Sequence, residues 1–359
     1  MINLGLGTGD LFWDAPIDRN RKIDIIKEAL SLGFRLIDTA ENYGDSESLV
    51  GEAIKGIDSR TKIATKVSPQ NLGKNSIYES CMRSIDILGI DQIPIFQIHW
   101  PNPNIELGET IEGLLLLVEK HLIKEVGLCN YTKNAMYFIK NRFPDLPLNY
   151  AQHEFNLHER YLEHNGTLDF CADNEIEILA YSPLDQGQDA QENYDQKRTI
   201  TVVCRNYDIT KPQLMLAYLS NKTNVTPIVR TTKRAHLIQN VEAIAVPIDI
   251  NHMHMLDNVF EEPVHQVPVR RIKISLEGEW NRKVYETLEE AIANPLKFSP
   301  SPIELSKTIK KEGLLKPVRL KKIDDTDHGY ELVAGRIRFW AWVIAHESED
   351  VTISAYIRK

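Results

Sequence analysis

Residues 33–44 read GFRLIDTAENYG, a short apolar strand that runs into a polar loop. The strand pattern stays apolar up to Asp38, and a helical pattern begins at Ser46, directly after the loop. The segment is therefore predicted to be one strand–loop–helix unit. In a barrel of parallel strands, catalytic residues lie at the carboxyl ends of the strands. Tyr43 in this loop is a candidate proton donor, and Asp38 is a candidate for tuning it.

The same alternation of strand and helix repeats along the first part of the chain. Short apolar runs, typical of strands that are buried on both faces, alternate with segments of helical periodicity. The predicted strands are residues 3–8, 35–39, 62–67, 93–99, 125–129, 148–155, 176–181 and 225–229. Eight such units over about 250 residues favour a closed (β/α)8 TIM barrel, an α/β fold, over an open doubly wound sheet.

The pattern changes after the last of these units. Residues 251–263 are predicted to be a linker, and residues 264–359 combine extended segments, helices and alternating apolar and charged strands. This second segment is predicted to be a separate small α+β domain. The predicted organisation is therefore a barrel at residues 1–250, a linker at 251–263 and a second domain at 264–359. A chain of 359 residues is long enough for two domains.

The composition is that of an ordinary globular protein, with 42% hydrophobic and 26% charged residues. No apolar run reaches the roughly 18–20 residues of a membrane helix, and no signal peptide is visible. The four cysteines are scattered without a CxxC pair, which argues against a disulfide framework or a zinc site. We therefore expect a cytoplasmic protein that binds no metal and does not associate with membranes.

The net charge of −9 is unevenly distributed along the chain. From Glu261 onward there are 17 Lys and Arg against 16 Asp and Glu, so the negative charge lies in the preceding part. The net negative charge of the barrel therefore does not favour nucleic-acid binding. In the nearly neutral second domain, a local basic patch could still bind an anionic partner.

Four polar residues lie at or just beyond the ends of the second, third and fourth predicted strands: Asp38, Tyr43, Lys66 and His99. Taken one at a time, each could equally be a surface or capping residue, but strand ends converge at one mouth of a barrel. Lys66 ends an apolar strand, where a desolvated ammonium needs an anion, and Asp38 is the candidate. An ammonium near Tyr43 lowers the pKa of the phenol, which would make it a usable general acid. His99 could orient a substrate oxygen.

Six runs in this part of the chain resemble, in order, the signature runs of the aldo-keto reductases. They are DTAENYG at 38–44, ATK at 64–66, IHWP at 98–101, GLCNY at 127–131, QHEFNL at 152–157 and AYSPL at 180–184. The resemblance implies NADPH-dependent reduction of a small-molecule carbonyl substrate without a metal. It implies that Tyr43 protonates the carbonyl oxygen as hydride arrives, that Lys66 and Asp38 tune Tyr43, and that His99 positions the substrate.

The resemblance also implies a nicotinamide site. Tyr181 matches the tyrosine on which the nicotinamide ring stacks, and Asn130 and Gln152 match the side chains that hold its carboxamide. The family usually has Ser before that Asn, whereas this chain has Cys129, which is a weaker hydrogen-bond partner.

Residues 227–240, PIVRTTKRAHLIQN, resemble the segment of the family that binds the adenosine phosphate. Arg230 and Thr231 lie at the positions that would bind a 2′-phosphate, since a cation and the backbone amides at the start of a helix suit a phosphate. His236 stands where many members have Arg, which weakens the preference for NADPH and leaves NADH as a second cofactor. Asn240 fits the adenine contact.

Three runs in the second domain resemble the amino-terminal domain of ParB, of the ParB/sulfiredoxin fold. They lie at residues 267–272, 304–318 and 330–341. In that fold, a glycine-to-helix turn binds nucleotide phosphates through amides and arginines. Gly335, Arg336 and Arg338 would form that turn here, with Arg336 replacing the Glu of the Gly-Glu-Arg-Arg run. No cysteine lies in this domain, which excludes a sulfiredoxin-type mechanism, and we expect no direct DNA binding.

Two functions remain open from the sequence. The first is an aldo-keto reductase with an appended domain that senses a nucleotide or a partner. The second is a non-catalytic, cofactor-sensing scaffold whose ParB-like domain carries a nucleotide- or DNA-associated function. The acidic loop at residues 185–189, an awkward neighbour for a pyrophosphate, motivates the second function. Phosphotransfer by the second domain, with Glu304 as the base, is a third alternative. A domain that only docks a partner would explain the basic turn at residues 335–338 equally well.

Overall fold

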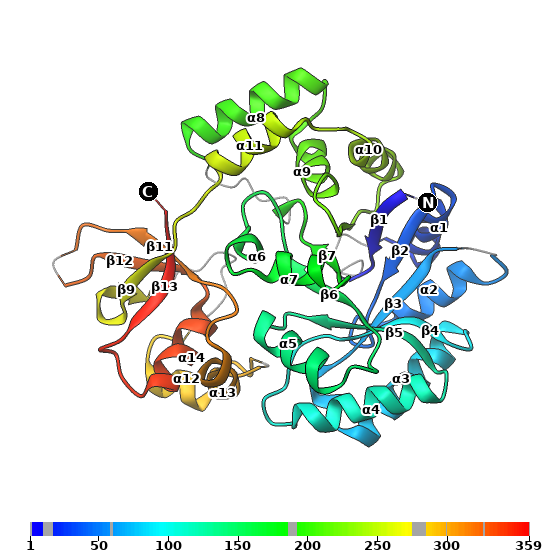
Figure 1. The fold of residues 1–359 in the computed structure, drawn as a ribbon, viewed down its shortest axis with the longest axis horizontal. Helices are drawn as coiled ribbons and strands as arrows, with labels where there is room; N and C mark the ends of the chain where they lie inside the picture. Colours follow the sequence, from blue (N-terminus) through cyan, green and yellow to red (C-terminus); the bar gives the residue numbers. More distant parts are fainter. Residues whose placement is uncertain are drawn as a thin grey trace. The chain divides into compact units, whose positions relative to one another are not determined.

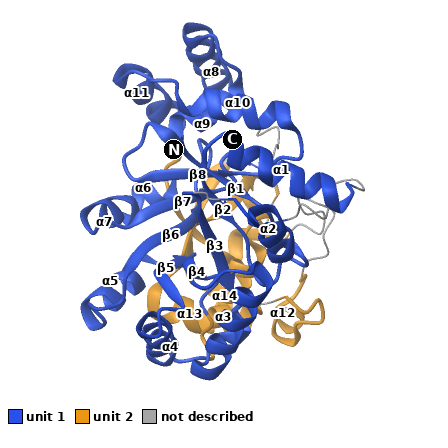
Figure 2. Ribbon diagram, turned by 90° about the vertical axis from the view of Figure 1, so that its right-hand side faces the viewer, with its two compact units in different colours: residues 1–101, 105–260 blue, residues 102–104, 261–359 orange. Residues whose placement is uncertain are grey.

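The computed structural model describes residues 2–9, 17–57, 60–185, 192–274, 285–298, 300–325 and 327–358. The chain divides into two compact units, shown in different colours in Figure 2. Unit 1 comprises residues 1–101 and 105–260, and unit 2 comprises residues 102–104 and 261–359. No helix in the described ranges is both long enough and apolar enough to cross a membrane.

In the described part of unit 1, eight parallel strands form a closed barrel (Figure 1). The strands are β1 (Ile2–Gly7), β2 (Phe34–Asp38), β3 (Lys62–Val67), β4 (Ile93–Ile98), β5 (Ile123–Cys129), β6 (Leu148–Glu154), β7 (Glu177–Tyr181) and β8 (Val225–Val229). The barrel closes where β1 pairs with β8, with Gly5 opposite Ile228 and Leu6 opposite Val229. The predicted (β/α)8 barrel is confirmed.

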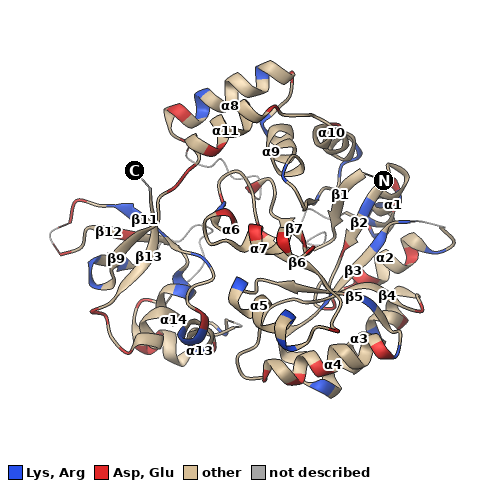
Figure 3. Cartoon of the chain, in the orientation of Figure 1, with Lys and Arg blue, Asp and Glu red and all other residues tan. Residues whose placement is uncertain are grey.

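The helices in the described part of unit 1 surround this barrel (Figure 1). They are α1 (Arg19–Ser31), α2 (Ser46–Ile54), η1 (Pro69–Asn71), α3 (Lys74–Leu88), α4 (Leu107–Glu119), α5 (Lys133–Arg142), α6 (Tyr161–His164), α7 (Thr167–Asp173), α8 (Tyr194–Tyr207), α9 (Lys211–Ser220), α10 (Arg234–Ile244) and α11 (Ile250–Val259). Figure 3 shows both basic and acidic residues along α3 and α8.

The prediction of a linker at residues 251–263 is wrong over most of its length, because α11 occupies it. Asp249 caps this helix by accepting hydrogen bonds from the backbone amides of Asn251 and His252. Met253 and Leu256 are buried on its inner face. The segment is rich in His and Asn, so its short buried stripe was not recognised as a helix.

The alternation of side chains along β2 directs the carboxylate of Asp38 into the barrel. Ile37 packs outward with the helices, in a cluster that includes Leu4 and Val50. Leu36, one position earlier, belongs to a separate cluster contributed by strands alone: Leu36, Ala64, Ile95, Tyr150, Leu179 and Ile228. Because successive side chains of a strand point to opposite faces, Asp38 follows Leu36 on the inner face, one layer nearer the mouth.

The barrel interior also has a polar layer at the amino ends of its strands. Arg35 pairs with Glu177 at 2.6 Å, and Lys62 pairs with Glu125 at 2.6 Å. Lys62 also donates a hydrogen bond to the hydroxyl of Tyr150 at 2.8 Å. The apolar layer therefore separates these ion pairs from the carboxyl-end mouth where Asp38 lies.

The described residues of unit 2 form a five-stranded sheet in the order β10-β12-β11-β13-β9. Its strands are β9 (His265–Pro268), β10 (Ile272–Ile274), β11 (Val318–Lys322), β12 (Tyr330–Ala334) and β13 (Thr352–Arg358). Its helices are η3 (Val269–Arg271), α12 (Leu288–Ala293), α13 (Pro302–Glu312) and α14 (Arg336–His346). β11 and β12 pair antiparallel. The extended segment predicted from residue 264 is interrupted by η3, so its halves lie at opposite edges of the sheet.

Candidate active site

The structure brings the four predicted catalytic side chains together at the carboxyl-end mouth of the barrel. Asp38 ends β2, Lys66 lies near the end of β3, and His99 directly follows β4. Lys66 Nζ donates to Asp38 Oδ2 at 2.7 Å, and it lies 4.9 Å from the centre of the Tyr43 ring. Tyr43 Oη lies 3.3 Å from His99 Nε2. The phenol is thus flanked by an ammonium and an imidazole.

Lys66 is fully buried, with 0% of its surface exposed. It donates a second hydrogen bond to the backbone carbonyl of Thr39 at 2.8 Å. Burial alone would lower the pKa of Lys66, but the charge of Asp38 and the nearby Tyr43 raise it above its usual value. Lys66 is therefore an ammonium at neutral pH, and its charge is balanced by Asp38 inside the protein.

The pKa of Tyr43 is raised above its usual value, which corrects the direction expected from the sequence. Burial raises it most, and Lys66 lowers it by a smaller amount. The predicted influence of the ammonium is present, but desolvation of the phenolate outweighs it. Tyr43 is consequently protonated at neutral pH and holds a proton that it can donate.

His99 is neutral at physiological pH. Burial, followed by the charge of Lys66, lowers its pKa to about 3. Its Nδ1 atom is buried and has no hydrogen-bond partner among the described residues. Nε2 is therefore the nitrogen that meets Tyr43 Oη, and a neutral imidazole can share a hydrogen bond there without competing as a cation.

Sequence reasoning did not find Gln97, which contacts Asp38 from β4. Gln97 Nε2 donates to Asp38 Oδ1 at 3.2 Å, and Gln152 Nε2 donates to the same oxygen at 2.8 Å. The signal was a single amide in the otherwise apolar strand IPIFQI. A fully buried amide must find partners, so this residue type at this position marks a polar contact inside the barrel.

The residues matched to the nicotinamide site lie at the ends of β5, β6 and β7. Asn130 follows β5 with a positive φ of 61° and accepts a hydrogen bond from Tyr181 Oη at 3.1 Å. Its backbone amide donates to the carbonyl of Gln152 at 2.9 Å. Cys129 Sγ lies 3.5 Å from Gln152 Oε1, within reach of a thiol hydrogen bond. The structure therefore brings Asn130, Gln152 and Tyr181 together, and Gln152 also contacts Asp38.

The residues matched to the adenosine phosphate lie between β8 and α10. Arg230 is exposed, and Thr231 is buried. Thr231 Oγ1 accepts a hydrogen bond from the backbone amide of Lys233 at 3.1 Å and lies 3.3 Å from His236 Nδ1. Asn240 is buried on α10. The acidic loop predicted at residues 185–189 lies outside the described residues beyond Asp185.

In unit 2, Gly335 has a φ of 91° and precedes α14. A Cβ atom at this position would lie 2.9 Å from Arg338 Nη2, so the guanidinium lies across the glycine. Arg338 Nη2 donates to the carbonyl of Pro317 at 3.4 Å, and Arg336 Nη2 donates to that of Leu332 at 3.3 Å. The two arginines are thus held against the strands of their own unit.

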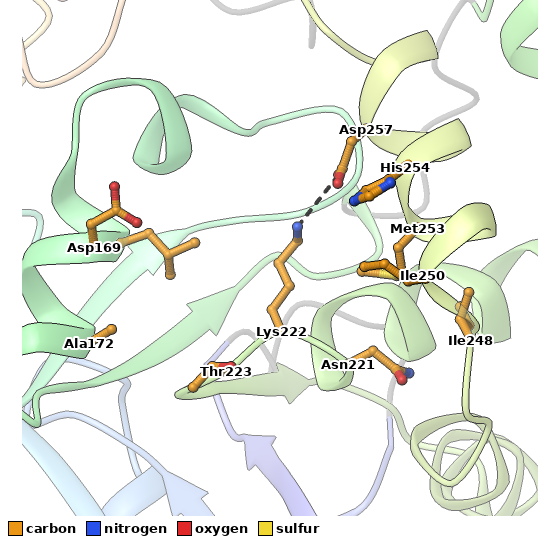
Figure 4. A pocket seen from close by; sticks show the side chains of 11 residues that line it. Asp169, Ala172, Asn221, Lys222, Thr223, Ile248, Ile250, Met253, His254 and Asp257 are labelled. Carbon is orange, nitrogen blue, oxygen red and sulfur yellow. Dashed lines mark ion pairs between the residues drawn. The ribbon is translucent and has the colours of Figure 1, made fainter.

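A cavity of about 430 Å³ lies at the other end of the barrel, where Lys222 and Thr223 precede β8 (Figure 4). Lys222 Nζ points to Asp257 at 3.5 Å and is also bound by Glu163 at 2.6 Å. The lysine charge is therefore balanced within the protein. The four predicted catalytic side chains, Asp38, Tyr43, Lys66 and His99, form a tetrad at the carboxyl ends of the strands. This cavity is therefore not part of the candidate active site.

Comparison with known proteins shows the family to which the barrel belongs. The model of the aldo/keto reductase family matches residues 3–261, and the chain belongs to that family. A relative is the methylglyoxal reductase YeaE of Escherichia coli, 26% identical over 262 residues, covering 72% of this chain and 91% of YeaE. An NADH-specific methylglyoxal reductase of the same organism is 28% identical over 299 residues, covering 68% and 90%. An aldo/keto reductase structure from Klebsiella pneumoniae, in complex with NADP and acetate, matches with a TM-score of 0.66 at 26% identity, covering 72% and 91%.

The lowered pKa of His99 predicts a pH dependence of stability. Its pKa is about 3 in the folded chain but 6.5 in the unfolded chain, so the unfolded chain binds the proton first on acidification. The neutral His99 side chain therefore contributes its full share to the stability of the fold above pH 6.5, and this contribution is lost as the pH falls towards 3. The unfolding free energy of wild type, measured by urea titration, should fall between pH 7 and pH 5. The fall should be about 1–2 kcal/mol larger in wild type than in His99→Asn.

The matched control is His164→Asn, at an exposed position on α6. It should follow the wild-type pH dependence. An identical loss of stability in wild type and His99→Asn would contradict the assignment of a neutral, buried His99.

Proposed function

We propose that the barrel reduces an aldehyde or ketone to an alcohol with NADPH. One observation carries the proposal: a protonated phenol, Tyr43, lies beside the neutral imidazole of His99 and above the buried ammonium of Lys66. This arrangement presents a proton donor at the barrel mouth with a cation ready to stabilise the phenolate that remains. The complex of the Klebsiella relative with NADP supports the choice of cofactor.

The chemistry follows from the charges of these groups. A nicotinamide cofactor, when bound, would supply the hydride for the carbonyl carbon and would be left oxidised. Tyr43 Oη donates its proton to the carbonyl oxygen, so that the product is a neutral alcohol. The phenolate is stabilised by Lys66, whose charge is fixed by Asp38, and His99 Nε2 orients the carbonyl oxygen towards Tyr43.

The side chains beside the tetrad fit a nicotinamide. Asn130 and Gln152 carry amides, which offer the donors and acceptors that a carboxamide requires, and Tyr181 offers a ring for stacking. We assign them these roles. For the adenosine end we assign Arg230, Thr231 and His236 to the 2′-phosphate and Asn240 to the adenine.

Small aldehydes are the first substrates to test. Two relatives from Escherichia coli carry the name methylglyoxal reductase. Because one of them is named as NADH-specific and His236 is not an arginine, NADH belongs in the same panel as NADPH. The substrate class proposed here is therefore a small, reactive carbonyl compound such as methylglyoxal.

Replacement of Tyr43 by Phe should remove the proton donor while keeping the ring over Lys66. We expect kcat for carbonyl reduction to fall at least about 100-fold, since general acid catalysis contributes 10²–10⁴-fold. The Kd for NADPH, measured by fluorescence, should stay within about threefold of wild type, because the variant removes no contact assigned to the cofactor. Tyr137→Phe, at an exposed position on α5, is the control. Equal turnover by Tyr43→Phe and wild type would refute the role of Tyr43.

Arg230→Ala should separate the two cofactors. The exposed guanidinium is assigned to the 2′-phosphate, which NADH lacks. We expect the Kd for NADPH to rise at least about tenfold, as for the loss of one charge-assisted contact, and the Kd for NADH to stay unchanged. Arg205→Ala, at an exposed position on α8, is the control. An equal loss of affinity for NADPH and NADH would show that Arg230 does not bind the 2′-phosphate.

For unit 2 we propose a ParB/sulfiredoxin-like domain that binds a nucleotide. The observation in favour is the β12–Gly335–α14 turn, with its left-handed glycine and arginines in the first helical turn. Amides and cations at such a turn suit a phosphate. The alternative, in which unit 2 acts on a DNA-associated partner and the barrel only senses the cofactor, predicts no turnover with any carbonyl.

Calorimetric titration of the full chain with ATP, CTP and GTP tests this second site. Saturation with NADP beforehand blocks the barrel, so that heat reports on unit 2. We expect binding of at least one nucleotide, with at least about tenfold weaker affinity in Arg338→Ala, because a guanidinium–phosphate contact is lost. Lys310→Ala, at an exposed position on α13, is the control. No heat with any nucleotide would remove the proposal.

A further inference from the structure

Gln97 is a buried polar residue that the proposed chemistry leaves without a role. It lies in β4 with 0% of its surface exposed. Its amide nitrogen donates to Asp38 Oδ1, and its amide oxygen lies 3.7 Å from Cys129 Sγ. A buried amide is costly unless both ends are paired, and here both ends point to residues of the active site.

The carboxylate of Asp38 is held by three donors among the described side chains. Lys66 binds Oδ2, whereas Gln97 and Gln152 both bind Oδ1, at 3.2 Å and 2.8 Å. Asp38 is only 5% exposed, so water cannot readily replace a lost donor. Each amide therefore contributes to holding the carboxylate that balances Lys66.

Gln152 is needed in two places. In this structure its amide nitrogen is bound to Asp38, but in the proposed function the same side chain holds the carboxamide of the nicotinamide. If Gln152 turns its amide nitrogen to the carboxamide when the cofactor binds, its contact with Asp38 is weakened or broken. Unless a second donor stays in place, Oδ1 of a buried carboxylate would then lose its amide partner.

The surroundings of Gln97 keep its amide directed at Asp38. β4 pairs with β5 so that Gln97 lies opposite Gly127, and a Cβ atom on Gly127 would lie 2.7 Å from Gln97 Cγ. The glycine thus leaves the space that this side chain occupies. The amide oxygens of both glutamines face the Cys129 thiol, which can donate its one proton to either, and both amide nitrogens face the carboxylate.

We propose that Gln97 is a positioning residue that keeps Asp38 Oδ1 bonded while Gln152 turns from Asp38 to the cofactor. Gln97 contacts neither the substrate nor the cofactor and acts through Asp38. The inference rests on the proposed function, because it requires Gln152 to hold the nicotinamide carboxamide. It predicts that the effects of Gln97 and Gln152 on cofactor affinity are coupled.

A double-mutant cycle on the Kd for NADPH tests this coupling. Gln97→Met preserves the length of the side chain but removes its donor, and we expect the Kd to rise about tenfold, because Gln152 must then leave Asp38 without an amide. Gln152→Met should also raise the Kd. The double variant should bind NADPH no more weakly than Gln152→Met alone, because no Gln152 remains to be released.

A purely structural role for Gln97 predicts additive effects, so a further tenfold loss in the double variant would overturn the proposal. An unchanged Kd in Gln97→Met would overturn it as well. Gln92→Met, whose amide donates to the carbonyl of His121, is the matched control and should bind NADPH like wild type. If Gln97→Met does not fold, as judged by circular dichroism, Gln97→Leu takes its place in the same cycle.

The wild-type titration separates this inference from the proposed function. If wild type does not bind NADPH, the proposed function fails and the inference fails with it. If wild type binds NADPH and the cycle is additive, only the role of Gln97 is refuted.

Discussion

The ion pair between Lys66 and Asp38 is the interaction on which the barrel mouth depends. Both side chains are buried, and a buried ammonium is tolerated only because a carboxylate lies 2.7 Å away. The surrounding groups follow from this pair: Thr39 supplies a carbonyl to the ammonium, and the glutamines supply amides to the carboxylate. The pair places a fixed positive charge beneath the Tyr43 ring without leaving a net charge in the protein interior.

Burial sets the protonation state of the other two groups. It raises the pKa of Tyr43 and lowers that of His99, so both are neutral beside the charged pair of Lys66 and Asp38. A neutral phenol can give up a proton, and a neutral imidazole can hold an oxygen in place without becoming the acid itself. We therefore propose different roles for the two residues although they lie within hydrogen-bond distance.

Much of this arrangement could be predicted from the sequence, because strands buried on both faces leave short apolar runs, and residues at their ends converge. Asp38, Lys66 and His99 were found in this way. Helix α8 was missed because the β-branched run from Thr199 to Val203 resembles a strand, and only the capping box at Asn193 marks its start. Gln97 and the pKa direction of Tyr43 depend on three-dimensional burial, which a linear pattern does not give.

The protonation state of Lys66 tests the central claim most directly. The side-chain nitrogen of Lys66 can be followed by NMR on protein labelled with ¹⁵N-lysine, with Lys66→Met to assign its signal. We predict that Lys66 remains an ammonium beyond pH 10.4, where ordinary exposed lysines are half-titrated. A neutral amine at pH 8 would contradict the account, because no fixed cation would then stabilise the phenolate of Tyr43.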